Sequence, residues 1–435
     1  MEGFQFPHSL EDDTRQPLFL LTIPKSLSST LFPNETIKLG FLMPSLAYWV
    51  ELLGFVLLTL LFASLMGLFL YKTVIQTKQE RTTTAYLIGF GGILPFWLSW
   101  PILLFNLVDV KNGLFRFFVG SIVPIVCSFR TIEAISGLCP SYATKSTKDF
   151  LFYFSTIPIA ARVKVKHPNS NIGDPIPCSN SKKLQYLKRF IPLLFLLGAY
   201  QSILVPHKDL NLFGMGIPSD EEIHWHSKQR YFTWQLYANS ALQALLFQLY
   251  LTTYVEALTF VFCVLTGYDV EPVMLNPLLE SKSPIDFWGK RWNTLIHTVL
   301  KNGVYKPLRQ LGAHRLGAIL GTFVASGVFH EWLLGVALVY DDRFVHSERR
   351  YSSTPTLGGA IVFFAWQALL IGAEMAIGKT AVVQTLSKQL PQSLKTALVV
   401  VSGLPLAHFF LEPYMTSGFF FQHGNTGLPM WIHVE

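Results

Sequence analysis

The chain has 435 residues, of which 51% are hydrophobic and 14% are charged, and its formal net charge is +7. Soluble domains contain about 25% charged residues, so this composition excludes an ordinary soluble enzyme, a disordered chain and a collagen-like or disulfide-rich scaffold. The positive residues lie between apolar stretches and form no separate basic domain. Membrane topology therefore explains the charge better than a nucleic-acid partner, and we expect no nucleic-acid binding.

Apolar stretches long enough to cross a bilayer begin at residue 48. The first span covers 48–71, which exceeds the roughly 20 helical residues that a bilayer core requires. The apolar stretch from Leu18 to Ile23 is too short, and wrongly flanked, for a cleaved signal peptide. Further spans are predicted at 86–107, 114–129, 189–206, 234–267, 316–340, 356–377 and 395–412. The fold class is thus all-α, a polytopic transmembrane bundle of about eight helices, in which 234–267 forms one tilted helix or a helix with a re-entrant turn.

The distribution of basic residues orients this bundle. Loops on one side contain 23 Lys and Arg and those on the other side contain 10, so the positive-inside rule places the richer side in the cytosol. The predicted organisation is a luminal N-terminal tail (1–47), a transmembrane domain (48–412) with cytosolic loops at 130–188 and 268–315, and a C-terminal tail (413–435). We expect an integral multi-pass protein of the endoplasmic reticulum.

Two short patterns bear on modification and metal binding. The only N-x-S/T sequon begins at Asn34, in the predicted luminal tail, where glycosylation is expected. The cysteines have no C-x-x-C pair and no metal-like spacing with histidine, so we expect no disulfide framework and no metal site: they are Cys127, Cys139, Cys178 and Cys263.

One ionisable residue, His330, lies near the middle of the predicted span 316–340. Ionisable groups at that depth are costly and usually face the bundle interior or a wet cavity. A neutral histidine there suits a general base for a hydroxyl, and the alternative is a buried histidine that hydrogen-bonds a neighbouring helix. The adjacent Glu331 points about 100° away on an ideal helix, so we do not expect it to orient the imidazole. Small residues on the same helix predict close packing on a neighbour: Gly317, Gly321 and Ala325.

The loop before this helix contains Asp286-Phe287-Trp288-Gly289-Lys290-Arg291-Trp292-Asn293, and His330 follows in the apolar sequence SGVFHEW. These residues resemble the membrane-bound O-acyltransferase superfamily, and the DFWGKRWN form is most similar to its wax-synthase-like branch. In that superfamily an Asn or His in a cytosol-facing aromatic motif precedes a His in a hydrophobic helix, as Asn293 precedes His330 here.

The resemblance implies an enzyme that transfers an acyl group from acyl-CoA, a co-substrate and not a bound cofactor, to an alcohol. It implies that His330 is the base that deprotonates the acceptor hydroxyl. It also implies that Asn293 holds the thioester or the developing oxyanion by hydrogen bonding. No cysteine or serine is positioned by motif as a nucleophile, so direct transfer in a ternary complex is expected.

The cytosolic side of the motif is expected to meet CoA. Six bases of this loop suit contact with the CoA phosphates, and Lys290 and Arg291 are favoured over the other four, which are Lys301, Lys306, Arg309 and Arg315. Trp288 or Trp292 suits contact with the adenine. The alternative is that bases and aromatics at this interface only reflect topology.

The acceptor is expected to be a hydrophobic alcohol that arrives through the bilayer. The stretch FRTIEA, Phe129 to Ala134, resembles fungal secondary-metabolite O-acetyltransferases of the same branch, which implies acetyl-CoA as donor and a terpenoid-like acceptor. Long-chain wax ester synthesis is the alternative within the class. A proton-coupled transporter is the alternative from another class, because single polar residues are scattered over the spans, and a non-catalytic lipid-binding scaffold is a third. The sequence does not predict the oligomeric state.

Overall fold

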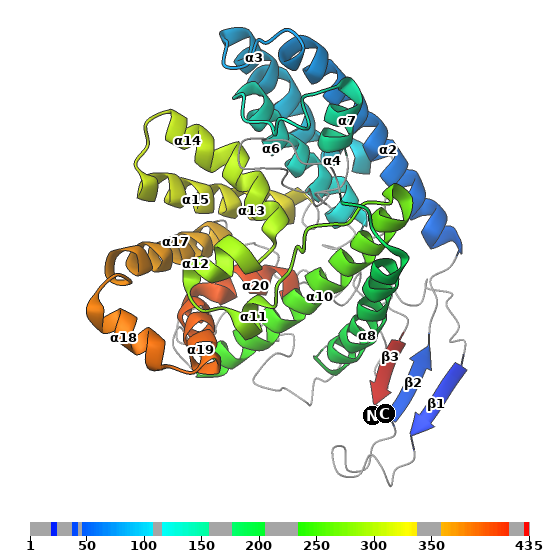
Figure 1. Cartoon of the computed structure of the whole chain (residues 1–435). Helices are drawn as coiled ribbons and strands as arrows, with labels where there is room; N and C mark the ends of the chain where they lie inside the picture. The colour runs from blue at the N-terminus through cyan, green and yellow to red at the C-terminus, as the bar shows by residue number, and fades with distance from the viewer. Residues whose placement is uncertain are drawn as a thin grey trace.

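The computed structural model describes residues 19–23, 37–41, 46–107, 115–155, 176–204, 234–336, 358–416 and 430–434. They form a helical bundle in which the N-terminal helices gather on one side and the C-terminal helices on the other (Figure 1). The N-terminal group consists of α2 (Leu46–Leu70), the π-helical turn η2 (Tyr71–Ile75), α3 (Thr83–Ile88), η3 (Gly89–Ile93), α4 (Leu94–Leu107), η4 (Arg116–Ile122), α6 (Val123–Ile135) and α7 (Thr147–Ser155).

Two long helices, α8 (Asn180–Leu204) and α10 (Trp234–Thr266), pack side by side after this group (Figure 1). The C-terminal group begins with short elements, which are α11 (Pro277–Glu280), α12 (Pro284–Asp286), η5 (Phe287–Arg291), α13 (Thr294–Leu300), η6 (Lys301–Tyr305) and α14 (Lys306–Gln310). It ends with α15 (Arg315–Leu334), α17 (Gly359–Ile377), α18 (Ala381–Gln389), α19 (Gln392–Gly403), the 3-10 turn η8 (Leu404–Leu406) and α20 (Ala407–Thr416).

The predicted transmembrane helical bundle is confirmed. Among the described residues, six segments are long and apolar enough to cross a membrane, namely Leu46–Ile75, Thr83–Leu107, Leu236–Thr266, Arg315–Leu334, Gly359–Ile377 and Gln392–Leu411. The apolar stretch 234–267 forms one continuous helix, α10, and not a helix with a re-entrant turn.

The described parts of the two remaining predicted spans, 115–129 and 189–204, are helical but differ from the six. Helix α6 is almost entirely buried inside the bundle. Helix α8 begins with a basic segment, so that its apolar part starts only at Phe190. The count of eight spans therefore stays a prediction.

Helix α2 shows how one helix serves both the bundle and the bilayer. Its buried residues Phe55, Thr59, Ala63 and Gly67 recur every fourth position and form one stripe. A Cβ on Gly67 would lie 2.9 Å from Phe154 Cδ1, so the small residues allow α7 to approach. Large side chains on the remaining surface are exposed, as expected for contact with lipid: they include Leu53, Leu57, Leu61 and Leu65.

Helices α15 and α17 pack closely at a residue outside the predicted small-residue stripe. A Cβ on Gly327 would lie 2.5 Å from Ile361 Cα, so only glycine fits there. In contrast, a Cβ on Gly317 would meet nothing within 4 Å, and one on Gly321 would meet only the flexible end of Leu308. Of the predicted residues, Gly321 packs against α14, Gly317 packs against nothing, and the role of Ala325 stays a prediction; the closest approach of α15 to a neighbouring helix is at Gly327.

Three short strands join the two tails, which the sequence analysis did not anticipate. β1 (Phe19–Ile23), β2 (Ile37–Phe41) and β3 (Met430–Val434) form an antiparallel sheet in the order β1-β2-β3, with Phe19 opposite Phe41 and Ile37 opposite Val434. The sheet lies beside α8 (Figure 1). The strands are short, and β2 pairs with β3 across almost the whole length of the chain, so local sequence gives little signal for the sheet. Asn34 lies outside the described residues.

Candidate active site

The motif segment folds into short helical turns and ends at Asn293. The Ser283 side chain accepts the backbone N–H of Asp286 at 3.2 Å, which begins α12. After η5, Asn293 adopts a φ of 41°, a left-handed conformation that asparagine tolerates better than most residues. Its Oδ1 accepts the N–H of Ile296 at 3.2 Å and begins α13. Asn293 therefore ends the motif segment and begins α13.

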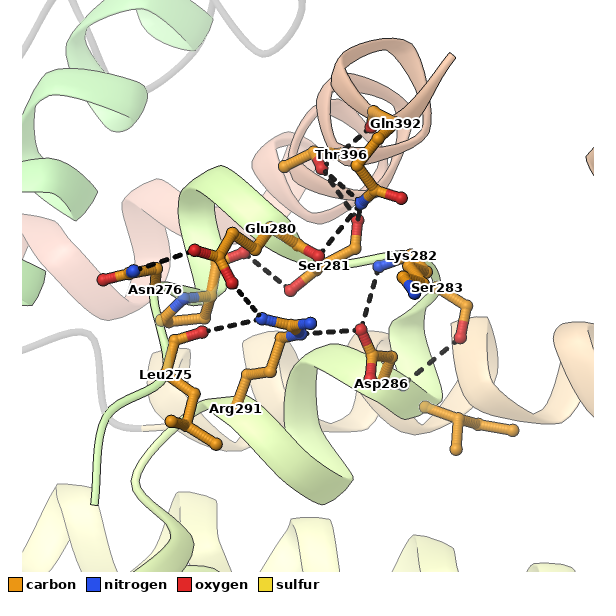
Figure 2. Close-up of polar contacts among 12 residues, drawn as sticks. Leu275, Asn276, Glu280, Ser281, Lys282, Ser283, Asp286, Arg291, Gln392 and Thr396 are labelled. Atoms are coloured by element: carbon orange, nitrogen blue, oxygen red, sulfur yellow. Dashed lines mark hydrogen bonds and ion pairs between the residues drawn. The ribbon is translucent and has the colours of Figure 1, made fainter. Parts of the chain in front are cut away.

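Arg291 is held by acceptors of the protein itself (Figure 2). Its Nε donates to Asp286 Oδ2 at 2.8 Å, and its Nη1 donates to Glu280 Oε2 at 2.8 Å and to the Leu275 carbonyl at 2.9 Å. Burial works against ionisation of Asp286, but the hydrogen bond from Arg291 keeps the pKa of Asp286 below its ordinary value. Arg291 thus braces the loop, and contact with CoA phosphates would compete with these bonds.

Helix α19 of the C-terminal group forms hydrogen bonds with the segment that precedes the motif (Figure 2). Thr396 Oγ1 donates to the Ser281 carbonyl at 2.9 Å, and Gln392 Nε2 donates to the Glu280 carbonyl at 3.0 Å. These bonds anchor the turn that precedes the motif.

Two polar residues within the spans anchor the loop in the same way. Gln248 Oε1 of α10 accepts the N–H of Leu278 at 3.1 Å, and Glu374 Oε2 of α17 accepts the N–H of Ile285 at 2.8 Å. Both belong to the single polar residues that are scattered over the predicted spans. In the structure they satisfy backbone donors of the loop, which would be costly to leave unpaired.

The motif tryptophans pack inward against helix side chains. Trp288 Nε1 donates to Gln367 Oε1 of α17 at 3.2 Å, and its ring meets Phe323 and Phe364 edge-on. The ring of Trp292 stacks on that of Phe287, with centroids 5.5 Å apart and planes 12° apart. Both tryptophans are half-buried in the bundle, and the expected contact of one of them with adenine stays a prediction.

His330 lies on α15 in an aromatic enclosure. Its Nδ1 is 3.0 Å from the Tyr414 hydroxyl of α20. Its ring stacks on Phe364, with centroids 5.1 Å apart and planes 15° apart, and meets Phe410 edge-on at 4.9 Å. Tyr414 thus occupies one ring nitrogen, which leaves Nε2 as the nitrogen available to a substrate.

Glu331 has a separate role, in agreement with the expected direction of its side chain. Its Oε1 accepts the N–H of Ala360 at 2.7 Å, in the first turn of α17. A carboxylate at a helix N-terminus satisfies an otherwise unpaired donor and complements the helix dipole. Glu331 therefore joins α15 to α17 and does not orient the imidazole.

A cavity of about 640 Å³ brings the two expected catalytic side chains to one space, because His330 and Asn293 both line it. Its walls are mainly apolar and come from α2, η4, α10, α13, α15, α17 and α20. Ser326, one turn before His330, also lines it. Of the other predicted site residues, Trp288 and Trp292 line the cavity, whereas Lys290 is exposed and, with Arg291, is absent from the described lining. The cavity volume of about 640 Å³ is in the range typical of small-molecule sites.

Polar and basic residues line the part of the cavity wall formed by α13, η6 and the start of α15. They are His297, Lys301, Tyr305 and Arg315. Burial, together with the nearby ammonium of Lys301, lowers the pKa of His297. Lys301 and Arg315 are both exposed, so their cations are accessible to an anion that reaches this wall.

Sequence reasoning missed Tyr414 and Gln367, which contact His330 and Trp288. Tyr414 falls beyond the predicted last span, and its contact with His330 joins residues 84 positions apart. A single sequence offers no local signal for such a contact. Gln367 lies within the predicted span 356–377, and a polar side chain at that depth was the one signal that could have found it.

The sequence matches known proteins in the region that contains this site. Residues 271–344 match the family described as "Membrane bound O-acyl transferase family". The match includes the motif segment and His330. It confirms the predicted resemblance to the membrane-bound O-acyltransferase superfamily.

Curated relatives from Arabidopsis thaliana are similar over parts of the chain. The chain is 33% identical to "Probable long-chain-alcohol O-fatty-acyltransferase 9" over 37% of this chain and 45% of the relative. It is 30% identical to "Probable long-chain-alcohol O-fatty-acyltransferase 6" over 41% and 51%. It is 37% identical to "Acyl-CoA--sterol O-acyltransferase 1" over 15% and 21%. The chain thus matches about half the length of the first two, and the resemblance to the wax-synthase-like branch is confirmed.

Proposed function

We propose that this chain, whose residues 271–344 match the membrane-bound O-acyl transferase family, is an acyl-CoA-dependent O-acyltransferase that acylates a hydrophobic alcohol. The observation that supports this most is that His330 and Asn293 line one largely apolar cavity. A base and an amide on the wall of an apolar space suit acyl transfer between a thioester and a lipid-soluble alcohol.

In this proposal His330 acts as the general base through Nε2. Nδ1 then carries the ring hydrogen and donates a hydrogen bond to the Tyr414 oxygen. Nε2 is therefore unprotonated and can accept a proton. As Nε2 removes the hydroxyl proton, the acceptor oxygen attacks the thioester carbonyl carbon. The tetrahedral intermediate collapses with cleavage of the C–S bond, and the imidazolium returns the proton to the CoA thiolate. The products are the ester and free CoA.

Asn293 stabilises the negative charge that develops on the carbonyl oxygen. Its Oδ1 is occupied by the Ile296 N–H, so its Nδ2 amide is the group that donates to the substrate. A preorganised donor of this kind typically contributes about 10²-fold to 10³-fold in rate. The cap at α13 fixes the amide before substrate arrives, which limits the cost of ordering it.

We assign phosphate contact to Lys301 and Arg315 in place of Lys290 and Arg291. Lys301 and Arg315 line the cavity and are exposed, whereas Arg291 is bonded to Asp286 and Glu280. Cations on the cavity wall suit the phosphates of CoA. The motif tryptophans then form the wall beside the acyl group, not the adenine site.

Transfer is direct and requires no acyl-enzyme. Ser326 and Ser402 both line the cavity, and Ser326 lies one turn before His330 on the same helix, so it is the first residue to test for a covalent intermediate. An acyl adduct trapped on Ser326 would overturn direct transfer.

Two substrate pairs follow from different observations. The printed names of the relatives favour a fatty-acyl donor with a long-chain alcohol, and one of them names a sterol acceptor. The resemblance of Phe129–Ala134 to fungal O-acetyltransferases favours acetyl-CoA with a terpenoid-like secondary metabolite.

We place the enzyme in the endoplasmic reticulum membrane, with the motif facing cytosolic acyl-CoA and Asn34 glycosylated in the lumen. The acceptor enters from the bilayer.

The decisive experiment compares membranes that contain wild type, His330→Ala and His314→Asn. Each receives labelled acetyl-CoA or palmitoyl-CoA and a panel of fatty alcohols, sterols and terpenoid alcohols. His314 is exposed and caps the start of the same helix, and asparagine keeps a cap there, so His314→Asn is the matched control.

Wild type and the control are expected to form ester, and His330→Ala is expected to lose at least 100-fold, the lower bound for a general base. The donor and acceptor that give ester choose between the two substrate pairs. If wild type forms no ester, the proposal fails and proton-coupled transport becomes the next hypothesis. If His330→Ala retains wild-type rates, only the assignment of the base fails.

A further inference from the structure

A second polar cluster lies outside the cavity, on the stretch Phe129–Ala134 of α6. The Glu133 carboxylate is 1% exposed. Its Oε2 accepts the Tyr153 hydroxyl of α7 at 2.6 Å, and its Oε1 accepts Asn302 Nδ2 of η6 at 2.9 Å. Three elements that are distant in sequence therefore meet at one carboxylate.

Two further residues of the stretch, Arg130 and Phe129, also contact α7 and η6. Arg130, one turn before Glu133, stacks over the Tyr153 ring at 4.7 Å and donates from Nη1 to the Phe154 carbonyl at 3.2 Å. A Cβ on Gly303 would lie 2.9 Å from the Phe129 carbonyl oxygen, so η6 approaches the backbone of α6 closely. The stretch is thus a docking site for η6.

The element docked there forms part of the cavity wall. Asn302 and Gly303 face α6, while Lys301 and Tyr305 of the same short turn line the cavity. η6 is the π-helical middle of the continuous helical segment 294–310, and π-helical geometry inside an α-helix is less favourable than the α-helical turns on either side. Its placement therefore depends on what it contacts, and the Glu133–Asn302 bond is a buried polar contact that fixes it.

We propose that Glu133 is a positioning residue for acyl-CoA: through Asn302 it holds η6 so that Lys301 and Tyr305 face the cavity. This inference rests on the proposed function. Glu133 does not line the cavity in the described structure, so it acts on the donor through another residue. Its loss is expected to raise the KM for acyl-CoA and to leave kcat nearly unchanged, because His330 and its partners lie on other helices.

The geometry of the bond permits a rescue experiment. Asn302→Asp removes the donor to Glu133 Oε1, and above about pH 7, where Glu133 is ionised, the two carboxylates in contact repel each other. The double variant Glu133→Gln/Asn302→Asp restores a donor and an acceptor in reversed positions. The amide nitrogen introduced by Glu133→Gln would then donate to the new carboxylate, and its amide oxygen would still accept the Tyr153 hydroxyl.

The test measures KM for acyl-CoA and kcat separately, per amount of folded protein, in wild type, the two single variants and the double variant. Tyr186→Phe is the matched control, because it removes a phenol donor from the buried carboxylate of Asp269, away from η6. Asn302→Asp is expected to raise the KM at least tenfold with kcat within twofold of wild type. The double variant is expected to recover most of that loss, and the control to keep the wild-type KM.

The inference is overturned if the double variant is no better than Asn302→Asp, or if the single variants lower kcat and leave the KM unchanged. It is also overturned if Tyr186→Phe raises the KM equally, since the effect would then be one of general stability. Absence of ester from wild type would overturn the proposed function as well. An active wild type without rescue overturns only the role of Glu133.

Discussion

Tyr414 on α20 lies 3.0 Å from Nδ1 of His330 on α15, so the last helix of the bundle fixes the imidazole of a helix 84 residues earlier. Tyr414 is fully buried. A buried hydroxyl beside a ring nitrogen sets both the tautomer and the orientation of the ring. The residue expected to act as base is therefore oriented by a side chain from another helix and not by its neighbour Glu331.

Tyr414→Phe is expected to lower kcat and to leave the KM for acyl-CoA nearly unchanged. The variant removes one hydrogen bond, worth about 1 kcal/mol, which corresponds to roughly fivefold in rate. Steady-state kinetics in purified membranes measure both constants. Tyr200→Phe is the control, because the Tyr200 hydroxyl donates to the Leu242 carbonyl, outside the His330 contact. Equal kinetics in Tyr414→Phe and wild type would contradict a role in orienting His330.

The sequence alone predicts the membrane helices, but it does not predict the contacts that the motif residues make. Apolar stretches predict the membrane helices because their burial in lipid depends on local composition. The bracing role of Arg291 depends on its contact with Glu280, which forms only in the folded loop. A basic residue in an aromatic motif therefore favours a phosphate ligand when the sequence is considered alone. Gly327 contacts α17 because of how two helices cross, and a small-residue pattern on one helix does not fix that crossing.

Arg291→Lys is expected to destabilise the protein even though it keeps the charge. A lysine cannot reproduce the planar fork that bonds Asp286, Glu280 and the Leu275 carbonyl together. We expect a lower melting temperature in detergent and a lower yield of folded protein. Lys290→Ala is the control, since Lys290 is exposed and is expected to be neutral. If Arg291→Lys folds normally and only raises the KM for acyl-CoA, Arg291 binds phosphate and the bracing role is wrong.

Gly327→Ala is expected to destabilise the bundle at the α15–α17 crossing. The added Cβ would lie 2.5 Å from Ile361 Cα, and backbone atoms cannot move aside as a side-chain end can. Overpacking of this kind typically costs about 1–3 kcal/mol. Gly317→Ala on the same helix adds a Cβ to open space and is expected to be neutral or slightly stabilising. The two melting temperatures measure the difference, and equal values would show that the helices separate without cost.

Glu133 is expected to make stability depend on pH between about 4.5 and 7. Burial raises the pKa of Glu133 from 4.5 to about 7, although hydrogen bonds from Tyr153 and Asn302 and the nearby cations oppose the shift. The folded state therefore holds a proton that the unfolded state releases. The stabilisation is fully present below the unfolded pKa, falls by up to about 1.4 kcal/mol per pH unit as pH rises, and is lost above the folded pKa.

The titratable groups that face Glu133 do not account for the change in stability between about pH 4.5 and 7. They are the cations of Arg130 and Lys306, the phenols of Tyr142 and Tyr153, and the thiol of Cys139. Burial raises the pKa of Tyr142 and Cys139 further above neutrality. The melting temperatures of wild type and Glu133→Gln, measured from pH 5 to pH 8, isolate the effect. Wild type is expected to lose stability relative to Glu133→Gln up to about pH 7 and to run parallel to it above that value. Parallel curves over the whole range would show that Glu133 titrates in the folded protein as it does in the unfolded chain.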